Sequence, residues 1–146
     1  YPQTPLVYKM NRLLTNNLAA LLSLTLLLGC QTSKYKSTAT GLTYKILKKG
    51  KGPQAKPGDE VLLNETTSYR DGTVLYSNEA GQPIKIKLGA GQVTAAVEEG
   101  LTGMRTGEVK TVVAPPEMVK RSFYPDNVSP DSPLVIKLIL SGIVRE

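Results

Sequence analysis

The segment from Leu88 to Pro116, LGAGQVTAAVEEGLTGMRTGEVKTVVAPP, constrains the fold of this chain most strongly. After the end of a strand, Val93, Ala96 and Val97 recur at helical spacing over about two turns. A turn at Thr106-Gly107 then leads into a second strand. The segment therefore predicts one short, isolated helix between two strands.

The flanking segments predict strands joined by turns. A short strand begins near Leu42, and a glycine- and proline-rich loop, KKGKGPQAKPGDE, follows it. The strand from Glu60 to Tyr69 ends at the turn Arg70-Asp71-Gly72-Thr73, which reverses the chain. Residues 83–88, PIKIKL, alternate inward isoleucine or leucine with outward lysine, as in a half-buried antiparallel strand. The strand from Leu134 to Val144 is apolar almost throughout, so we expect it in the middle of the sheet.

The composition limits the chemistry that the chain can perform. Its 146 residues, 40% hydrophobic and 21% charged, have the size and balance of one globular domain. Only 5% are aromatic, with no Trp, so we expect Leu, Ile and Val to fill the core. The chain has no His and a single Cys, which excludes the usual zinc sites and the Ser-His or Cys-His nucleophiles.

The formal net charge is +6, but the Lys and Arg residues are scattered along the chain. This distribution favours a solvated surface over a nucleic-acid site. A weak attraction to anionic lipid headgroups is a further interpretation of the same charge.

The N-terminal segment predicts a secretion signal. Arg12 precedes an apolar run from Leu18 to Leu28, which is too short for a bilayer because spanning needs about 20 residues. The closing residues Leu27-Leu28-Gly29-Cys30 resemble a bacterial lipobox, which implies diacylation of the Cys30 sulfur. The alternative is that Cys30 is an ordinary buried residue or an unpaired thiol.

These patterns divide the chain into three parts. Residues 1–29 are an upstream segment and a lipoprotein signal peptide, residues 30–40 a lipidated flexible tether, and residues 41–146 the folded domain. Residues 1–9 precede a plausible start at Met10, which leaves open whether the natural protein contains them. We expect localisation in the cell envelope, lipid-anchored and facing the periplasm or the cell exterior.

Two stretches, residues 41–61 (GLTYKILKKGKGPQAKPGDEV) and residues 88–116, resemble the FKBP-type peptidyl-prolyl cis-trans isomerase domain. The similarity extends in order from Gly41 to Val144. It implies an α+β fold in which a curved antiparallel sheet of about five strands wraps around one short helix. It also implies a proline-binding pocket at the start of the helix and no cofactor.

The resemblance implies rotation about Xaa-Pro bonds in unfolded or partly folded polypeptides. This rotation must overcome a barrier of roughly 18–20 kcal/mol, which arises from amide resonance. An apolar pocket removes the water hydrogen bonds that favour the planar amide, and its walls select the twisted geometry. The expected site is therefore hydrophobic, with one or two polar groups that orient the peptide.

The resemblance also assigns the pocket residue by residue. Most assigned positions carry aliphatic side chains where the family has rings, and Glu65 stands where it has a tyrosine. The Glu65 carboxylate must then be solvated or paired with Arg70, Lys85 or Lys87. We expect the Thr94 backbone amide to bind the substrate carbonyl. From composition alone, the aliphatic members are ordinary core residues and Tyr76 is an exposed tyrosine at a strand end. The implied pocket residues are Leu75, Tyr76, Ile84, Val93, Thr94, Val97, Val128 and Ile136.

Two functions of different classes follow from these patterns. The first is a membrane-tethered isomerase that assists protein folding, with weakened catalysis. The second is a non-catalytic lipoprotein of the same fold that holds a protein partner through its sheet face or through residues 120–128. An inert envelope spacer is a third interpretation. We expect no nucleic-acid partner.

Overall fold

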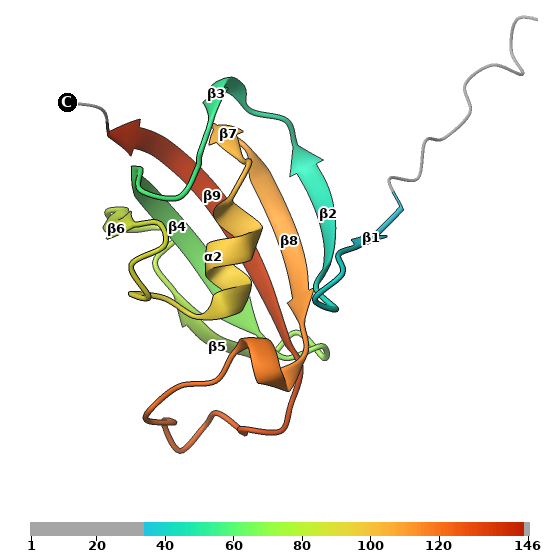
Figure 1. Cartoon of the computed structure of the whole chain (residues 1–146). Coiled ribbons are helices and arrows are strands. Elements are labelled where there is room, and N and C mark those ends of the chain that lie inside the picture. Colours follow the sequence, from blue (N-terminus) through green and yellow to red (C-terminus); the bar gives the residue numbers. More distant parts are fainter. Residues whose placement is uncertain (1–33, 145–146) are drawn as a thin grey trace, which may run out of the picture. The chain divides into compact units, whose positions relative to one another are not determined.

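The computed structural model describes residues 34–144, which form antiparallel strands around a single α-helix (Figure 1). The predicted signal peptide, Cys30 and the first part of the predicted tether lie outside the described residues. Within residues 34–144, no helix is long and apolar enough to cross a membrane. The helical elements are α2 (Ala95–Leu101) and the 3-10 helix η2 (Pro116–Met118). The strands are β1 (Lys36–Ser37), β2 (Thr43–Lys48), β3 (Lys51–Gln54), β4 (Glu60–Ser68), β5 (Val74–Ser77), β6 (Ile84–Lys87), β7 (Arg105–Thr106), β8 (Val109–Ala114) and β9 (Leu134–Val144).

Seven strands form one antiparallel sheet in the order β1-β2-β8-β9-β4-β5, and β6 also pairs with β4. Strand β9 lies between β8 and β4 and is hydrogen-bonded to both. Its residues at alternate positions from Leu134 to Leu140 are buried, and those between them are half-buried. The central position of β9 explains its nearly continuous apolar sequence and confirms that prediction.

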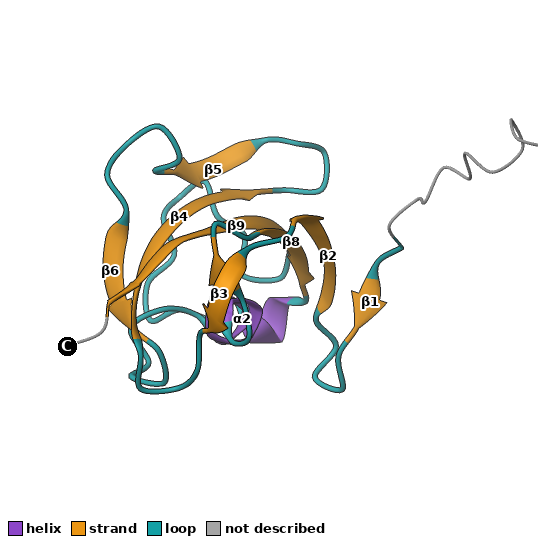
Figure 2. Cartoon of the chain, turned by 90° about the horizontal axis from the view of Figure 1, so that it is seen from above, coloured by secondary structure: helices purple, strands orange, loops and turns teal. Residues whose placement is uncertain are grey.

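The sheet curves around α2, which lies against its concave side (Figure 2). This arrangement confirms the predicted fold class. Helix α2 buries Ala96, Val97 and Leu101. Gly100 permits close packing on β8 and β9, because a Cβ at this position would lie only 2.6 Å from Leu138 Cδ1.

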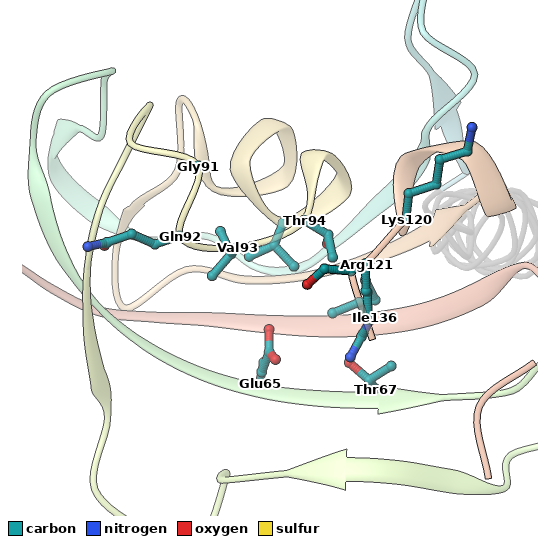
Figure 3. A pocket seen from close by; sticks show the side chains of 11 residues that line it. Glu65, Thr67, Gly91, Gln92, Val93, Thr94, Lys120, Arg121 and Ile136 are labelled. Carbon is teal, nitrogen blue, oxygen red and sulfur yellow. The ribbon is translucent and has the colours of Figure 1, made fainter. Parts of the chain in front are cut away.

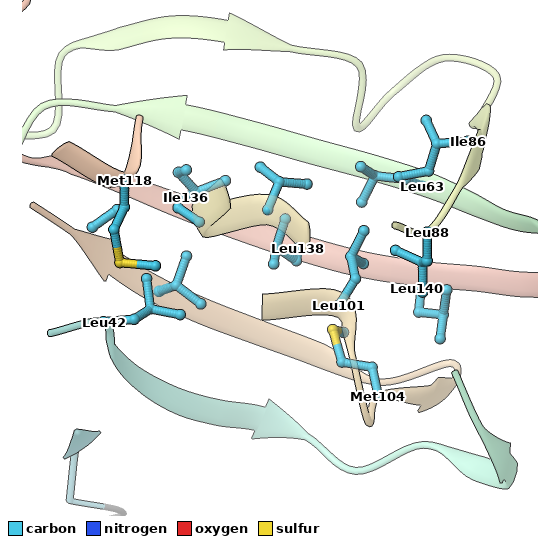
Figure 4. Close-up of a cluster of buried hydrophobic side chains, with 14 of the residues drawn as sticks. Leu42, Leu63, Ile86, Leu88, Leu101, Met104, Met118, Ile136, Leu138 and Leu140 are labelled. Atoms are coloured by element: carbon cyan, nitrogen blue, oxygen red, sulfur yellow. The ribbon is translucent and has the colours of Figure 1, made fainter. Parts of the chain in front are cut away.

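The core between α2 and the sheet consists of aliphatic and methionine side chains (Figure 4). Fully burying one such leucine contributes about 1.5–3 kcal/mol to the free energy of unfolding. Tyr44 and Tyr69 are only partly buried and pack at the margin. The expectation of an aliphatic core is therefore met. The largest fully buried side chains of this core include those of Leu42, Leu63, Leu88, Leu101, Met104, Leu134, Ile136, Leu138 and Leu140.

Asn78 organises the junction between β5 and β6. Its Oδ1 accepts a hydrogen bond from the Glu65 N–H at 2.7 Å, and its Nδ2 donates to the Leu63 carbonyl at 3.2 Å. The Asn78 side chain thus takes the place of a strand partner between β5 and β6, which pair with successive stretches of β4. Because two short strands share one side of β4, and β1 adds an edge, the sheet has more strands than the expected five.

The predicted loop after β2 contains a strand that the sequence pattern missed. Strand β3 pairs with β7, which immediately precedes Gly107 of the predicted turn. At Gly50, just before β3, a Cβ would lie 2.4 Å from the Arg105 carbonyl oxygen. The glycine that indicated a loop therefore permits a close contact between two distant backbone segments.

Two further expectations differ from the structure. Ile84 begins β6 but is 38% exposed, so only Ile86 and Leu88 of the alternating segment reach the core. Strand β1 lies inside the segment predicted to be a tether and pairs with β2. The sheet therefore begins before Gly41.

Candidate functional site

A cavity of about 400 Å³ lies beside the start of α2. Strands β4 and β9, the residues that precede α2 and the loop that follows η2 all contribute to its wall (Figure 3). Its volume is in the range of small-molecule sites. The residues that line it are Glu65, Thr67, Gly91, Gln92, Val93, Thr94, Val97, Lys120, Arg121, Ser122 and Ile136.

The apolar part of the cavity is built by α2 and β9. Val97 is buried on α2 at 4% exposure, and Val93 packs against the core just before the helix. Ile136 is fully buried on β9, directly opposite Thr67 of β4. These side chains form an aliphatic surface without an aromatic ring.

Glu65 brings a carboxylate to the same cavity, where it points from β4 toward the start of α2 (Figure 3). Burial raises the pKa of Glu65 above its ordinary value, and the nearby Arg121 charge partly opposes this rise. Among the described residues, no hydrogen-bond donor reaches its buried Oε2. The expected pairing with Arg70, Lys85 or Lys87 is wrong, because Lys85 binds Glu60 at 3.0 Å and the opposing charge comes from Arg121.

Thr94 places a second unsatisfied polar atom at the cavity. It is the N-cap residue of α2, but its side chain does not cap the helix. Its Oγ1 is buried and has no hydrogen-bond partner among the described residues. Glu65 and Thr94 therefore place two buried, unsatisfied polar atoms in the wall of the cavity.

Lys120, Arg121 and Ser122 of the loop between η2 and β9 line the cavity opposite the residues before α2. Tyr69 holds this loop against the end of β4, since its hydroxyl donates to the Asn127 carbonyl at 3.0 Å and accepts from the Ser129 N–H at 2.8 Å.

The structure brings four of the eight predicted pocket residues together and leaves four elsewhere. Val93, Thr94, Val97 and Ile136 line the cavity. The others do not line it: Leu75 packs at the core margin, Tyr76 and Ile84 are 44% and 38% exposed, and Val128 is buried in the loop before β9.

A second cavity, of about 430 Å³, contains none of the predicted pocket residues. Lys110 lines it, and its Nζ donates to the Gly100 carbonyl at 2.8 Å and lies 5.3 Å from the centre of the Tyr44 ring. Burial lowers the pKa of Lys110, and Glu108, 3.7 Å away, opposes this shift. Because these contacts already engage the ammonium, its role here is to bind the end of α2.

One family model, described as FKBP-type peptidyl-prolyl cis-trans isomerase, matches residues 52–140. This span covers more than half of the chain and includes every residue that lines the first cavity. The chain belongs to the FKBP-type peptidyl-prolyl cis-trans isomerase family. Its enzyme class is accordingly that of the peptidyl-prolyl cis-trans isomerases.

Proteins similar to this FKBP-type chain include curated relatives from fungi and from the plant Arabidopsis thaliana, and a solved structure from Escherichia coli. FK506-binding protein 2 of Candida glabrata is 38% identical over 101 residues, which cover 65% of this chain and 74% of the relative. FK506-binding protein 2 of Yarrowia lipolytica is 34% identical over 105 residues, which cover 70% and 73%. The crystal structure of FkpA from Escherichia coli has a TM-score of 0.67 at 26% identity, with coverage of 93% of this chain and 63% of FkpA. The chain thus spans less than two thirds of FkpA.

The FKBP resemblance missed several residues that line the cavity. Thr67 follows Glu65 by two positions on β4, so strand alternation alone would have placed both on one face. Gly91 and Gln92 directly precede Val93. Arg121 and Ser122 lie in an irregular loop, where no periodic pattern indicates the direction of a side chain.

Proposed function

We propose that this FKBP-type isomerase binds proline in the cavity beside α2 and catalyses Xaa-Pro isomerisation weakly, as a lipid-anchored folding factor of the cell envelope. The observation that carries the proposal is the aliphatic surface of Val93, Val97 and Ile136 beside the polar groups of Thr94. A proline ring fits the aliphatic surface, and the Thr94 backbone amide is the proposed donor to the substrate carbonyl.

The same cavity supports weakened catalysis. Aliphatic side chains give less contact area to the twisted transition state than aromatic rings would. The Glu65 carboxylate also adds a polar atom to a site that works by removing water from the amide. Both features reduce selective stabilisation of the transition state without abolishing the binding of proline.

The decisive assay measures isomerisation of an Xaa-Pro peptide by the full chain. We expect modest acceleration, which Val97→Asp abolishes because it places a charge in the aliphatic surface. Val74→Asp is the matched control, since Val74 is 58% exposed and does not line the cavity.

Val97→Trp should raise kcat/KM by adding a ring to the aliphatic surface of the cavity. Leu75→Phe is not expected to add to this gain, because Leu75 does not line the cavity. Circular dichroism verifies that each variant is folded.

The binding module is the second candidate, and exposed residues of the cavity loop favour it. Phe123 follows Lys120 and Arg121 in this loop and is 75% exposed, so its ring is free to be buried by a protein partner. If neither the unmodified chain nor a folded Val97→Trp variant accelerates isomerisation, the enzyme is rejected and the binding module remains.

The proposed anchor is Cys30, which lies outside the described residues. Its support is the apolar run that ends at Leu27-Leu28-Gly29-Cys30. We expect Cys30→Ser to give an unprocessed or soluble precursor, because the acyl chains make membrane residence stable. Ser33→Ala is the control and should be processed normally. A Cys30→Ser protein that is cleaved at the same bond and stays in the membrane fraction would refute acylation.

A further inference from the structure

Residues 34–51 carry positive charges only. The segment contains no Asp or Glu, and its lysines extend from just before β1, through β2, to the first residue of β3. All of them are exposed except Lys45, which is half-buried. We call this set the basic edge: it comprises Lys34, Lys36, Lys45, Lys48, Lys49 and Lys51.

The fold places Lys36, Lys45 and Lys48 on the edge strand β1 and its neighbour β2, and Lys51 begins β3 just after them in the chain. Strand β1 is the last strand of the sheet and pairs only with β2 in the part of the chain that the structure describes (Figures 1 and 2). Within residues 34–144, no carboxylate oxygen lies within 4.0 Å of any amino group of the basic edge. Two nearby carboxylates are already engaged: Glu99 accepts hydrogen bonds from Thr40, and Glu108 is buried beside Lys110.

Two large apolar side chains are exposed among these lysines. Tyr35 is 54% exposed just before β1, and Leu47 is 52% exposed. The pairing between β2 and β8 shifts register between Ile46 and Lys48, so Leu47 lies at an irregularity of β2. The register that pairs Lys36 with Tyr44 also places Tyr35 beside Lys45.

We propose that the basic edge is a membrane-contact surface that binds anionic phospholipid headgroups, with Tyr35 and Leu47 entering the interfacial layer. Lysines attract an anionic leaflet at short range, and tyrosine and leucine gain from burial at the interface. A nucleic acid accounts for the lysines and for the Tyr35 ring, on which bases stack, but not for the exposed aliphatic side chain of Leu47. The combination of charge and apolar groups therefore favours a lipid surface.

This surface does not require acylation, so it goes beyond the proposed function. It adds a second membrane contact close in sequence to Cys30, because Lys34 follows that residue by only four positions. Contact through β1 and β2 leaves the cavity beside α2 free, since the two share no residue.

The test uses the full chain with Cys30→Ser, which carries no acyl chains but keeps the apolar run from Leu18 to Leu28. Because that run enters both kinds of vesicle, the readout is the difference in binding between anionic and neutral vesicles. Flotation compares binding to phosphatidylglycerol–phosphatidylcholine vesicles with binding to pure phosphatidylcholine vesicles. Each lysine near an anionic surface contributes roughly fivefold in affinity. The triple variant Lys48→Gln, Lys49→Gln and Lys51→Gln should therefore bind anionic vesicles roughly 100-fold more weakly. Salt at about 1 M should weaken binding at least as much, because it shortens the Debye length to about 3 Å and screens all the lysines of the edge.

The matched control removes the same charge elsewhere. Lys85 and Lys87 lie on β6 and Lys56 lies between β3 and β4, outside the basic edge. A variant with Lys56→Gln, Lys85→Gln and Lys87→Gln should therefore keep its vesicle binding. Leu47→Ser should weaken binding several-fold, whereas Val74→Ser, at a residue that is similarly exposed, should not.

Equal losses in the two triple variants would show a general charge effect and overturn the proposal. A triple variant of the basic edge that loses duplex DNA binding but keeps vesicle binding would assign the edge to nucleic acid and also overturn it. Isomerase activity of the same variants is measured separately and should be unchanged. A failure of the proposed catalysis is therefore distinguishable from a failure of membrane contact.

Discussion

Replacing Glu65 with leucine tests the electrostatics of the cavity. The Glu65 Oε2 is buried with no hydrogen-bond partner among the described residues, and an unsatisfied buried acceptor costs about 1–3 kcal/mol. Leucine removes this cost and keeps the bond from the residue 65 backbone N–H to Asn78. We expect the free energy of unfolding at neutral pH to rise by about 1–3 kcal/mol, which corresponds to about 4–12 °C in Tm.

The pH dependence identifies the carboxylate as the cause. Because burial raises the folded-state pKa of Glu65, the folded protein binds this proton more tightly than the unfolded chain does. As pH falls through the raised pKa toward the ordinary value of 4.5, the original protein gains stability from Glu65, and it loses that contribution as pH rises again. The advantage of Glu65→Leu should therefore be largest at neutral pH and should shrink in acid.

Urea unfolding of both proteins between neutral and acid pH measures this difference directly. Glu65→Gln is the matched control, because it removes the charge but keeps a polar side chain of the same shape. It should lose the pH dependence and gain less stability than leucine. An advantage of Glu65→Leu that is constant over the whole pH range, or a leucine variant that is less stable at neutral pH, would refute the reasoning.

Three further predictions concern contacts that shape the site. Gly100→Ala should destabilise the domain by about 1–3 kcal/mol in urea unfolding, because the new Cβ meets Leu138; equal stability would show that the helix moves freely. Asn78→Ala should cost about 1–3 kcal/mol by leaving the Glu65 N–H without its acceptor, with Asn127→Ala as an exposed control expected to be near neutral. Tyr69→Phe should raise KM several-fold with a loss of about 1 kcal/mol in stability, because it frees the loop that lines the cavity; an unchanged KM would separate that loop from substrate binding.

The cavity shows where family resemblance and structure diverge. Val93, Thr94 and Val97 were predictable because they lie within five consecutive residues at the start of a short helix. Leu75, Tyr76 and Ile84 were assigned from their order around β5 and β6, but the Asn78 junction determines where these short strands lie on β4. Their alignment with the family pattern therefore does not bring their side chains to the cavity.

Local chemistry alone determined much of this protein. The alternation of side chains, the Asp71-Gly72 turn and the continuous apolar run of β9 act over a few residues. The longer strands of the main sheet, helix α2 and the central place of β9 were therefore readable from the sequence. Only the tertiary structure decided the pairing of β3 with β7, the placement of Arg121 near Glu65 and the exposure of Leu47 beside unpaired lysines. The β3–β7 pairing and the approach of Arg121 to Glu65 each join parts of the chain that are more than 50 residues apart. The exposure of Leu47 depends on the register between β2 and β8. Residue spacing along the chain carries no information about such distances, because they are set when the whole sheet closes around its core.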